Sequence, residues 1–352
     1  MSDISEALIQ QVDNARIEKR RLKIVGGDSK SFYGRETDGE VLSLKEHRGI
    51  VSYHPVELVI TARAGTTLAE IDTVLAEHQQ MLSFEAPEFT PQSTIGGTLA
   101  CNFSGPGRPW LGSVRDQLLG VRLINGKAEH LRFGGQVMKN VAGYDVSRLQ
   151  AGALGTLGAI TEISFKVLPR PQASCTLRQP MEMQEAISLM NRHSGESRSM
   201  TAACWWQGAL YIRLSGSQKA VSATLARWSG ELMTGADEFW QQLRDHQLAF
   251  FSAEKPLWRF SVKSSSDGFL PQDDWLIDWG GAQRWLRGDQ DFVRLQGLAE
   301  QAQGQVSCYR GGDRQAERFH PQPRALQLIQ QRLKQAFDPA GIFNAGRLYS
   351  WL

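Results

Sequence analysis

The sequence of 352 residues predicts a two-domain α+β protein. Strand and helix signals alternate irregularly in the first half, with hairpins between strands rather than the repeated βαβ units of a doubly wound sheet. The composition then changes: thirteen of the 34 glycines lie between Gly96 and Gly158, whereas nine of the ten tryptophans follow Cys204. The proline-containing segment 168–172 lies at this change and favours extended backbone, so we place a domain boundary there.

The first half opens with a strand signal followed by a helix signal. Residues 56–63 form a β-rich run that ends at Gly65. Thr67 and Glu70 then have the spacing of a capping box, and the apolar residues after them repeat at helical spacing. This pattern predicts a strand, a turn and an amphipathic helix.

Two further strand signals follow. The dipeptide Asn125-Gly126 stands between apolar runs, which predicts a β-hairpin with a two-residue type I′ turn. Later, Ile163, Phe165 and Val167 alternate with polar residues. That alternation predicts a strand buried on one face only.

The second half carries weaker signals. Residues 181–191 and 236–246 are predicted to be helical, and residues 209–214 to form a strand. Near the end an amphipathic helix is predicted by apolar residues at helical spacing, namely Leu326, Ile329, Leu333 and Phe337. Asp338-Pro339 is expected to end this helix.

Composition excludes several classes of function. A net charge of +2 gives no reason to expect a nucleic-acid partner. The four cysteines, Cys101, Cys175, Cys204 and Cys308, are scattered, so we expect reduced thiols and no metal or iron–sulfur site. No apolar run is long enough to cross a membrane, and residues 1–11 lack a signal-peptide pattern. A cytoplasmic location is therefore expected.

The first glycine-rich segment is Ile24-Val25-Gly26-Gly27-Asp28-Ser29-Lys30. Glycines allow a backbone to approach a ligand closely, so successive N–H groups can converge on an anion. Ser29 and Lys30 would add a hydroxyl and a positive charge. By itself the segment is equally compatible with a tight turn that binds nothing.

The second segment runs from Ser93 to Asn102 and continues to Gly107. Two adjacent glycines followed by small residues suit a backbone that passes close to a planar or phosphorylated ligand. Arg108 is the only charged residue between Glu88 and Val114. Exposed loops are rarely so poor in charge, which favours a binding segment.

The third segment extends from Asn140 to Arg148 and then through glycines spaced three apart, Gly152, Gly155 and Gly158. The sequence contains neither the GxGxxG fingerprint after a strand nor the GxxxxGK[ST] loop. An NAD-dependent dehydrogenase with a Rossmann domain and a P-loop NTPase are therefore disfavoured.

Together, these segments resemble the FAD-binding domain of the vanillyl-alcohol oxidase and p-cresol methylhydroxylase (PCMH) family. The matching segments, in the family's order, are 25–30, 59–71, 94–97, 143–145, 155–161 and 337–347. The resemblance implies a two-subdomain PCMH-type FAD-binding domain over 1–171 and an α+β cap domain over 172–324. A C-terminal helix and tail, 325–352, would pack on the FAD domain and return to the flavin.

Three segments, 113–116, 131–145 and 277–281, are most similar to the FAD-binding subunits of bacterial glycolate oxidases. This resemblance implies a flavoprotein subunit that supports oxidation of glycolate to glyoxylate. Its implied partners are a larger FAD-containing catalytic subunit and an iron–sulfur subunit that passes electrons to a quinone-type acceptor. The complex would place this cytoplasmic chain at the inner face of the membrane.

The resemblance also implies the residues that contact FAD. The pyrophosphate would lie against Gly26, Gly27, Ser29 and Lys30. The rest of the cofactor would be surrounded by Thr94, Gly96, Gly97, Asp145, Thr156 and Ile160, and Asn344 would approach the isoalloxazine ring. Residues 26–33 contain no histidine or cysteine, so FAD is expected to be bound non-covalently.

The substrate site departs from that of related 2-hydroxy-acid dehydrogenases, which carry a late HxGDGNxH-type motif. The nearest match is Tyr309-Arg-Gly-Gly-Asp313, with no histidine before His320. Arg310 and Arg314 could bind a carboxylate, but His320 is expected to lie on the surface, and the catalytic base stays unassigned. We therefore expect a chain that holds flavin without oxidising a hydroxy acid alone.

Two alternatives stay open. One is a self-sufficient FAD-dependent dehydrogenase of another small hydroxy acid or alcohol. The other is a non-catalytic assembly subunit with a vestigial flavin site. Most tryptophans are expected in the core, but Trp205 and Trp206 are neighbours on a predicted strand and point to opposite faces, so one of them could face a partner.

Overall fold

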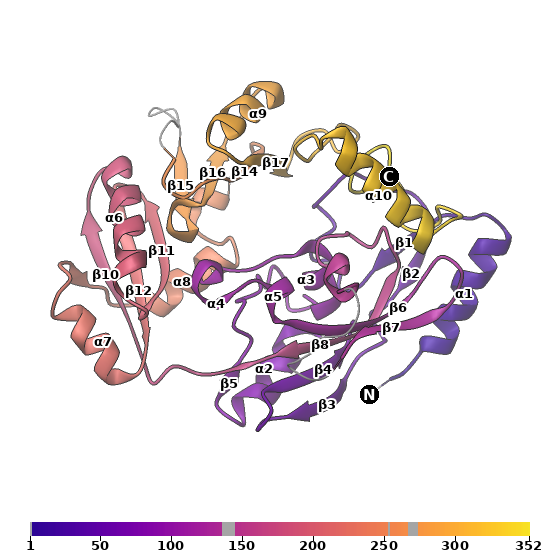
Figure 1. The fold of residues 1–352 in the computed structure, drawn as a ribbon, viewed down its shortest axis with the longest axis horizontal. Helices are drawn as coiled ribbons and strands as arrows, with labels where there is room; N and C mark the ends of the chain where they lie inside the picture. The colour runs from indigo at the N-terminus through magenta and orange to yellow at the C-terminus, as the bar shows by residue number, and fades with distance from the viewer. Residues whose placement is uncertain (1, 136–144, 253, 267–273) are drawn as a thin grey trace. The chain divides into compact units, whose positions relative to one another are not determined.

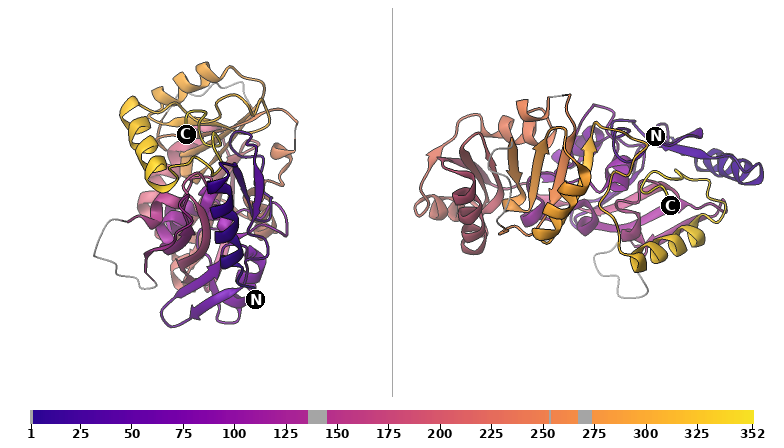
Figure 2. Two further views of the ribbon diagram at one scale, coloured as in Figure 1. Left: turned by 90° about the vertical axis from the view of Figure 1, so that its right-hand side faces the viewer. Right: turned by 90° about the horizontal axis from the view of Figure 1, so that it is seen from above.

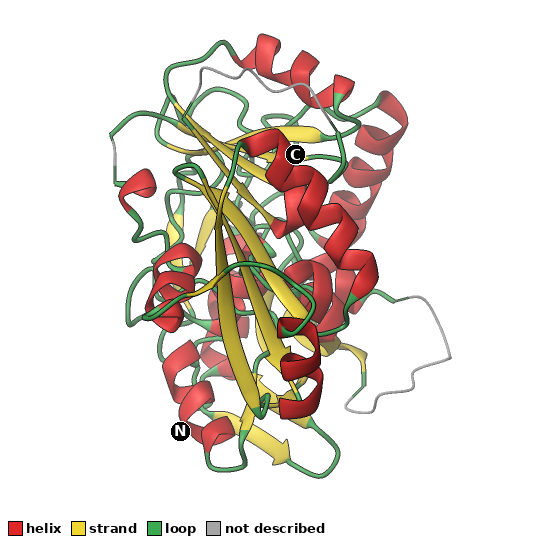
Figure 3. Ribbon diagram, turned by 90° about the vertical axis from the view of Figure 1, so that its left-hand side faces the viewer, coloured by secondary structure: helices red, strands yellow, loops and turns green. Residues whose placement is uncertain are grey.

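The computed structural model describes residues 2–135, 145–252, 254–266 and 274–352, and its mixture of helices and strands confirms the α+β class (Figures 1 and 3). Contacts divide the chain into two compact units. Unit 1 comprises Met1–Phe103, Ser113–Pro169 and Asp313–Leu352, and unit 2 comprises Ser104–Gly112 and Arg170–Gly312. The chain thus changes unit near the boundary expected after residue 171 and also at residue 312. The functional domain assignment stays a prediction.

Unit 1 is built around a five-stranded antiparallel sheet. In spatial order its strands are β3 (Ile50–His54), β4 (Val59–Arg63), β8 (Ala159–Lys166), β6 (Leu118–Ile124) and β7 (His130–Gly134). The apolar face of this sheet shares a core with the helices α2 (Leu68–Ala76), α3 (Ile95–Cys101) and α5 (Val114–Gln117). Smaller elements of the same unit are β5 (Gln80–Met81), β9 (Leu168–Pro169) and the 3₁₀ turn Ser147–Gln150.

A second subdomain of unit 1 joins the two ends of the chain. The parallel strands β1 (Leu22–Val25) and β2 (Glu40–Ser43) share a core with α1 (Ser5–Ile17) and with Ile342 and Phe343 of the C-terminal tail. Helix α10 (Arg324–Phe337), yellow in Figure 2, precedes this tail and belongs to the same unit as α1, which is indigo.

Unit 2 contains an eight-stranded antiparallel sheet. Its spatial order is β13 (Glu231–Leu232), β10 (Ala173–Pro180), β12 (Ala209–Gly216), β11 (Met200–Trp206), β15 (Trp275–Asp278), β16 (Gln283–Arg287), β14 (Leu257–Ser261) and β17 (Gln305–Arg310). The accompanying helices are α4 (Arg108–Leu111), α6 (Met183–Glu196), α7 (Gln218–Leu225), α8 (Ala236–Arg244) and α9 (Phe292–Gln301), with 3₁₀ turns at Ala249–Phe251 and Trp279–Gly281.

Several local predictions are confirmed. Thr67 caps α2: its hydroxyl accepts from the Glu70 N–H, and the Glu70 carboxylate accepts from the Thr67 N–H. Most tryptophans of unit 2 lie in its core, as expected. Trp205 and Trp206 are both half-buried, and the Trp205 indole donates to the Met181 carbonyl. A partner contact there stays a prediction.

The hairpin between β6 and β7 forms, but its predicted two-residue turn is wrong. The strands end at Ile124 and resume at His130, and the Asn125 side chain organises the longer loop by accepting from the N–H groups of Lys127 and Glu129. Gly126 is not part of a two-residue turn but allows close packing against Asp338. A Cβ there would lie 2.3 Å from a carboxylate oxygen of Asp338, so the glycine lets the hairpin loop meet the C-terminal tail.

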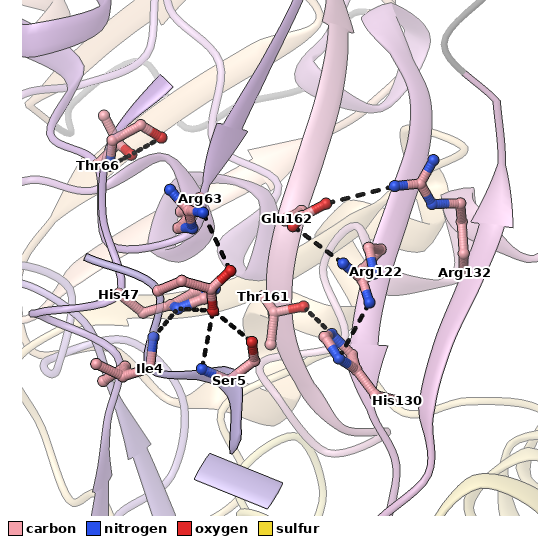
Figure 4. A network of polar contacts seen from close by, with 12 residues as sticks. Ile4, Ser5, His47, Arg63, Thr66, Arg122, His130, Arg132, Thr161 and Glu162 are labelled. Carbon is pink, nitrogen blue, oxygen red and sulfur yellow. Dashed lines mark hydrogen bonds and ion pairs between the residues drawn. The ribbon is translucent and has the colours of Figure 1, made fainter. Parts of the chain in front are cut away.

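Strand β8 is buried on both faces, so the prediction of a half-buried strand is also wrong. It lies in the middle of the sheet, and its polar side chains are satisfied by partners across the neighbouring strands. Glu162 accepts from Arg122 at 3.2 Å and pairs with Arg132 at 3.6 Å (Figure 4). Thr161 shares a hydrogen bond of 2.8 Å with His130.

The same polar face binds the N-terminal segment (Figure 4). The Ile4 N–H donates to Nδ1 of His47, and Arg63 donates to the Asp3 carboxylate at 3.0 Å. Burial lowers the pKa values of His47 and His130, which keeps the His47 ring neutral and able to accept. The alternation of apolar and polar residues along β8 therefore reflects two packed faces, one apolar and one polar, and not one packed face and one exposed face.

Helix α10 and its stop at Asp338 are confirmed, but its apolar stripe is not its buried face. Leu326 and Ile329 are 45% and 52% exposed, and Lys334 is the buried residue of the helix. The Lys334 ammonium donates to the carbonyls of Thr156 and Phe343, each at 2.8 Å, and to Asp338 at 2.7 Å. This amine fastens the tail to unit 1. Among the described residues, no helix is long and apolar enough to cross a bilayer.

Replacing Lys334 by methionine should lower the free energy of unfolding by about 3–5 kcal/mol, because the buried Asp338 carboxylate loses its cation. Unfolding in urea measures this change. Arg332→Met, on the exposed side of the same helix, is the matched control and should change stability by less than about 0.5 kcal/mol. Equal effects of the two substitutions would contradict a structural role for the buried pair.

Candidate cofactor site

A cavity opens in unit 1 where four segments meet. They are the end of β1 with the loop after it (24–31), residues 94–101 including α3, the residues before and at the start of β8 (154–160), and the tail (344–347). Leu44 and Ala64 add apolar surface.

The first glycine loop lies directly against the second. A Cβ on Gly27 would lie 1.6 Å from the Gln92 carbonyl oxygen, and one on Gly26 would lie 2.7 Å from the Thr94 hydroxyl oxygen. Ser93 donates a hydrogen bond of 3.0 Å to Ser29. The glycines therefore let two loops, distant in sequence, pass side by side at the cavity wall.

Helix α3 forms a second wall. Thr94 caps it by accepting from the Gly97 N–H at 3.3 Å, and Gly96 packs against Ala64, where a Cβ would lie 2.7 Å from the alanine Cβ. Gly97 differs from Gly96. Apart from Thr94 Oγ1 at 3.3 Å, nothing outside its own helix lies within 4 Å of a Cβ built on Gly97, so its missing side chain keeps the cavity open.

Asn344 joins the remaining two walls. Its side-chain N–H₂ donates to the Leu154 carbonyl at 2.6 Å, and its oxygen accepts from the Ile24 N–H at 2.9 Å. Gly155 has φ +74°, and a Cβ there would lie 2.6 Å from the Asn344 amide nitrogen. Both ends of this amide therefore hold backbone, so Asn344 positions the cavity walls.

Lys30 brings a buried positive charge to the cavity. Its side chain is 5% exposed, and the ammonium donates to the Ser29 hydroxyl at 3.3 Å. Burial lowers the pKa of Lys30 to about 8, and the nearby Cys101 and Glu88 oppose the shift. An anionic ligand in this cavity would restore the charged form.

Two cavity residues, Arg347 and Cys101, were missed by the sequence analysis. Nε of Arg347 is buried and has no hydrogen-bond partner among the described residues, while its Nη2 donates to the Lys30 carbonyl at 3.5 Å. Burial lowers the pKa of Arg347. Both residues stand inside segments with recognised glycines, but only the fold shows that their side chains turn inward.

Nine of the eleven predicted site residues line the cavity: Gly26, Gly27, Ser29, Lys30, Thr94, Gly96, Gly97, Ile160 and Asn344. Thr156 does not line it; its buried hydroxyl donates to the Ala153 carbonyl at 2.7 Å. Asp145 accepts from Ser147 and Arg148 and is also outside the lining. The preceding motif residues, 143 and 144, lie outside the described residues. Direct contact with a cofactor stays a prediction for all eleven.

The three residues considered for substrate binding do not all belong to the same unit. Arg310 belongs to unit 2. Arg314 belongs to unit 1, where it donates to the Ser31 carbonyl at 2.7 Å. His320 is 8% exposed, so the expectation of a surface histidine is wrong; its carbonyl accepts from the Tyr349 hydroxyl.

Comparisons with known proteins agree with this site. A family described as an FAD binding domain matches residues 5–134. The chain is 46% identical over 350 residues to the glycolate oxidase subunit GlcE of Escherichia coli strain K12, covering 99% of both chains. It is 33% identical over 140 residues to the glycolate oxidase subunit GlcD of Bacillus subtilis strain 168, which is 40% of this chain and 29% of that relative.

Solved structures show the same fold. Two structures of alkyldihydroxyacetonephosphate synthase superpose with TM-scores of 0.65 and 0.66, covering 96% of this chain and 75% of theirs, at 15% and 16% identity. At this identity the likeness concerns the fold alone.

The cavity fits FAD in three respects. Glycine-rich backbone lines it, the absent side chain of Gly97 leaves space, and Lys30 and Arg347 supply charge opposite to a diphosphate. The buried Nε of Arg347 still has a donor to offer. FAD is therefore a cofactor that these residues can hold.

The affinity for FAD should be constant up to about pH 8 and fall above it, approaching tenfold per pH unit. Above the pKa of about 8, Lys30 is neutral in the free protein, and binding a diphosphate must take up a proton. Quenching of flavin fluorescence, titrated from pH 7 to pH 9.5, measures this dependence. Lys30→Met removes the titrating group and should flatten the profile; parallel profiles would contradict the assignment.

The lowered pKa of Lys30 also affects the stability of the flavin-free protein. Because the folded pKa lies below the unfolded value of 10.5, the unfolded chain binds more protons between pH 8 and 10.5. The contribution of Lys30 to stability therefore rises with pH across this window in the absence of FAD.

Proposed function

Since the chain belongs to the family of the Escherichia coli glycolate oxidase subunit GlcE, we propose that it is the FAD-binding subunit of a complex that oxidises glycolate to glyoxylate. The observation that carries the proposal is a cavity that is lined by parts of the three glycine-rich segments and by the C-terminal tail. The chain is an FAD-dependent oxidoreductase subunit, with FAD as its cofactor.

The residues of the chain would divide the work as follows. Backbone at Gly26 and Gly27, which lines the cavity, would lie against the cofactor, and Lys30 and Arg347 would balance its negative charge. Asn344 keeps β1 and the 154–158 turn in place. Bound FAD would supply a two-electron carrier that can be reduced by electrons from glycolate oxidised in the partner.

The proposed partners are a larger FAD-containing catalytic subunit and an iron–sulfur subunit. GlcE and GlcD are each named as subunits of glycolate oxidase, which supports a multi-subunit assembly. Among the described lining residues of the cavity there is no histidine to act as a base. This supports oxidation of glycolate in the partner, with the present chain holding a second flavin in the cytoplasm, next to the membrane through its complex.

Purification of the chain with its partners, followed by counting of flavins, tests this proposal. We expect two FAD molecules per complex, both bleached by glycolate without oxygen. A complex that holds flavin only in the larger subunit would refute it. Bleaching of the isolated chain by a hydroxy acid or alcohol would instead support a self-sufficient dehydrogenase.

Gly97→Leu should fill the cavity with little change in the packing around it, because the Thr94 hydroxyl oxygen, at 3.3 Å, is the only atom outside the helix backbone within 4 Å of a Cβ at this position in the described structure. We expect FAD affinity to fall by at least about tenfold, or 1.4 kcal/mol, while the melting temperature of the flavin-free chain stays unchanged. Gly195→Leu, on an exposed helix position in unit 2 with nothing within 4 Å of its Cβ, is the matched control. Full glycolate activity in a complex carrying flavin-free Gly97→Leu would show that the chain is only an assembly subunit.

A further inference from the structure

We propose that the exposed apolar side of α10 is a docking surface for a helix of another subunit of the complex. The partner helix would carry an apolar stripe and, opposite Arg332, a carboxylate. The inference rests on the proposed function, because it takes the chain to be one subunit of a heteromeric assembly.

One side of α10 attaches the helix to unit 1. The Lys334 ammonium donates to the Thr156 carbonyl and to the Asp338 carboxylate. The centroid of the Phe337 ring lies 5.9 Å from that of the Phe133 ring on β7. These contacts fix the rotation of the helix about its axis, so the opposite side of the helix is turned away from them.

The side that is turned away is apolar. Leu326, Leu328 and Ile329 are 45%, 40% and 52% exposed. The spacing of 3, 4 and 3 residues that forms the seam between two packed helices is met by Leu326, Ile329, the half-buried Leu333 and the exposed Ala336. A single exposed leucine is ordinary on a protein surface, but a row of apolar residues along one helix indicates an interaction site.

Charge narrows the choice of partner. Helix α10 contains no acidic residue, and its two exposed charged side chains, Arg324 and Arg332, are both positive. Arg332 is four residues after Leu328 and three after Ile329, so its side chain lies beside both apolar side chains. Covering this side would remove the guanidinium from water, which requires a carboxylate in the partner.

A second copy of this chain does not meet that requirement at α10. Two α10 helices packed together would bring the arginines of both copies to one seam, and neither helix has an acid to offer. Four seam residues a side are also far fewer than the roughly 20–30 residues a side of a standard stable interface. In a heteromeric complex the same helix can be one part of a larger contact.

A lipid surface also conflicts with the position of Arg332. Helices that lie in a membrane interface keep their basic residues on the polar side and immerse only the apolar side. On α10, unit 1 occupies the side opposite the apolar row, and Arg332 stands between Leu328 and Ile329. Immersing this side would bury an unpaired charge among acyl chains.

Titration of the purified larger and iron–sulfur subunits with the fluorescently labelled chain tests the inference. Ile329→Glu and Arg332→Glu should each weaken binding at least about thirtyfold, because the first puts a charge in the seam and the second repels the partner's carboxylate. Val293→Glu, at a 73% exposed apolar residue of α9, is the matched control and should bind like the wild type. The isolated variants should keep the wild-type melting temperature and FAD affinity.

Wild-type affinity for the partner subunits in both α10 variants would overturn the inference. A lower melting temperature of the isolated Ile329→Glu chain would also overturn it, because this side would then pack within the chain. The same holds if Ile329→Glu abolishes self-association, or sedimentation with phosphatidylglycerol vesicles, and leaves subunit binding intact. A wild-type chain that binds no partner subunit would instead refute the proposed function, and the inference with it.

Discussion

One buried ammonium group holds the C-terminal helix and tail against the rest of unit 1. Lys334 donates to the backbone at Thr156 and Phe343 and to the Asp338 carboxylate, which itself accepts from the N–H groups of Ile342 and Phe343. These bonds satisfy main-chain groups that a buried tail would otherwise leave unpaired. Because the tail is fixed in this way, Phe343 packs in the core with β1, and the next residues enter the cavity.

The cavity follows from that attachment. Asn344 can bridge β1 and the 154–158 turn only while the tail runs beside Leu22, and Arg347 reaches Lys30 only from the same position. Glycines allow the close contacts that this arrangement needs. The missing side chain of Gly126 makes room for Asp338, that of Gly27 makes room for the Gln92 carbonyl, and that of Gly97 leaves space in the cavity. The cavity is thus a product of close backbone packing, and the side chains of Lys30 and Arg347 line it.

The polar face of the five-stranded sheet shows why the residue pattern along β8 gave a wrong prediction of its burial. Glu162 looks like a solvent-facing residue of an alternating strand, yet Arg122 and Arg132 pair with it (Figure 4). Likewise, the apolar stripe of α10 is partly exposed, while Lys334 lies beneath the helix. In both β8 and α10, polar side chains are buried because each has a charged or hydrogen-bonded partner. A pattern that counts only apolar residues cannot predict this burial.

The sequence by itself determined the features that depend on neighbouring residues: the Thr67 capping box, the glycine segments, the α+β class and nine of the residues that line the cavity. Tertiary structure alone decided the features that depend on distant partners. These are the longer hairpin loop at Asn125, the double burial of β8, the buried side of α10, and the inward turn of Arg347 and Cys101. A backbone turn is encoded by its own few residues, whereas the direction and charge balance of a buried side chain are decided by groups brought to it from elsewhere in the chain.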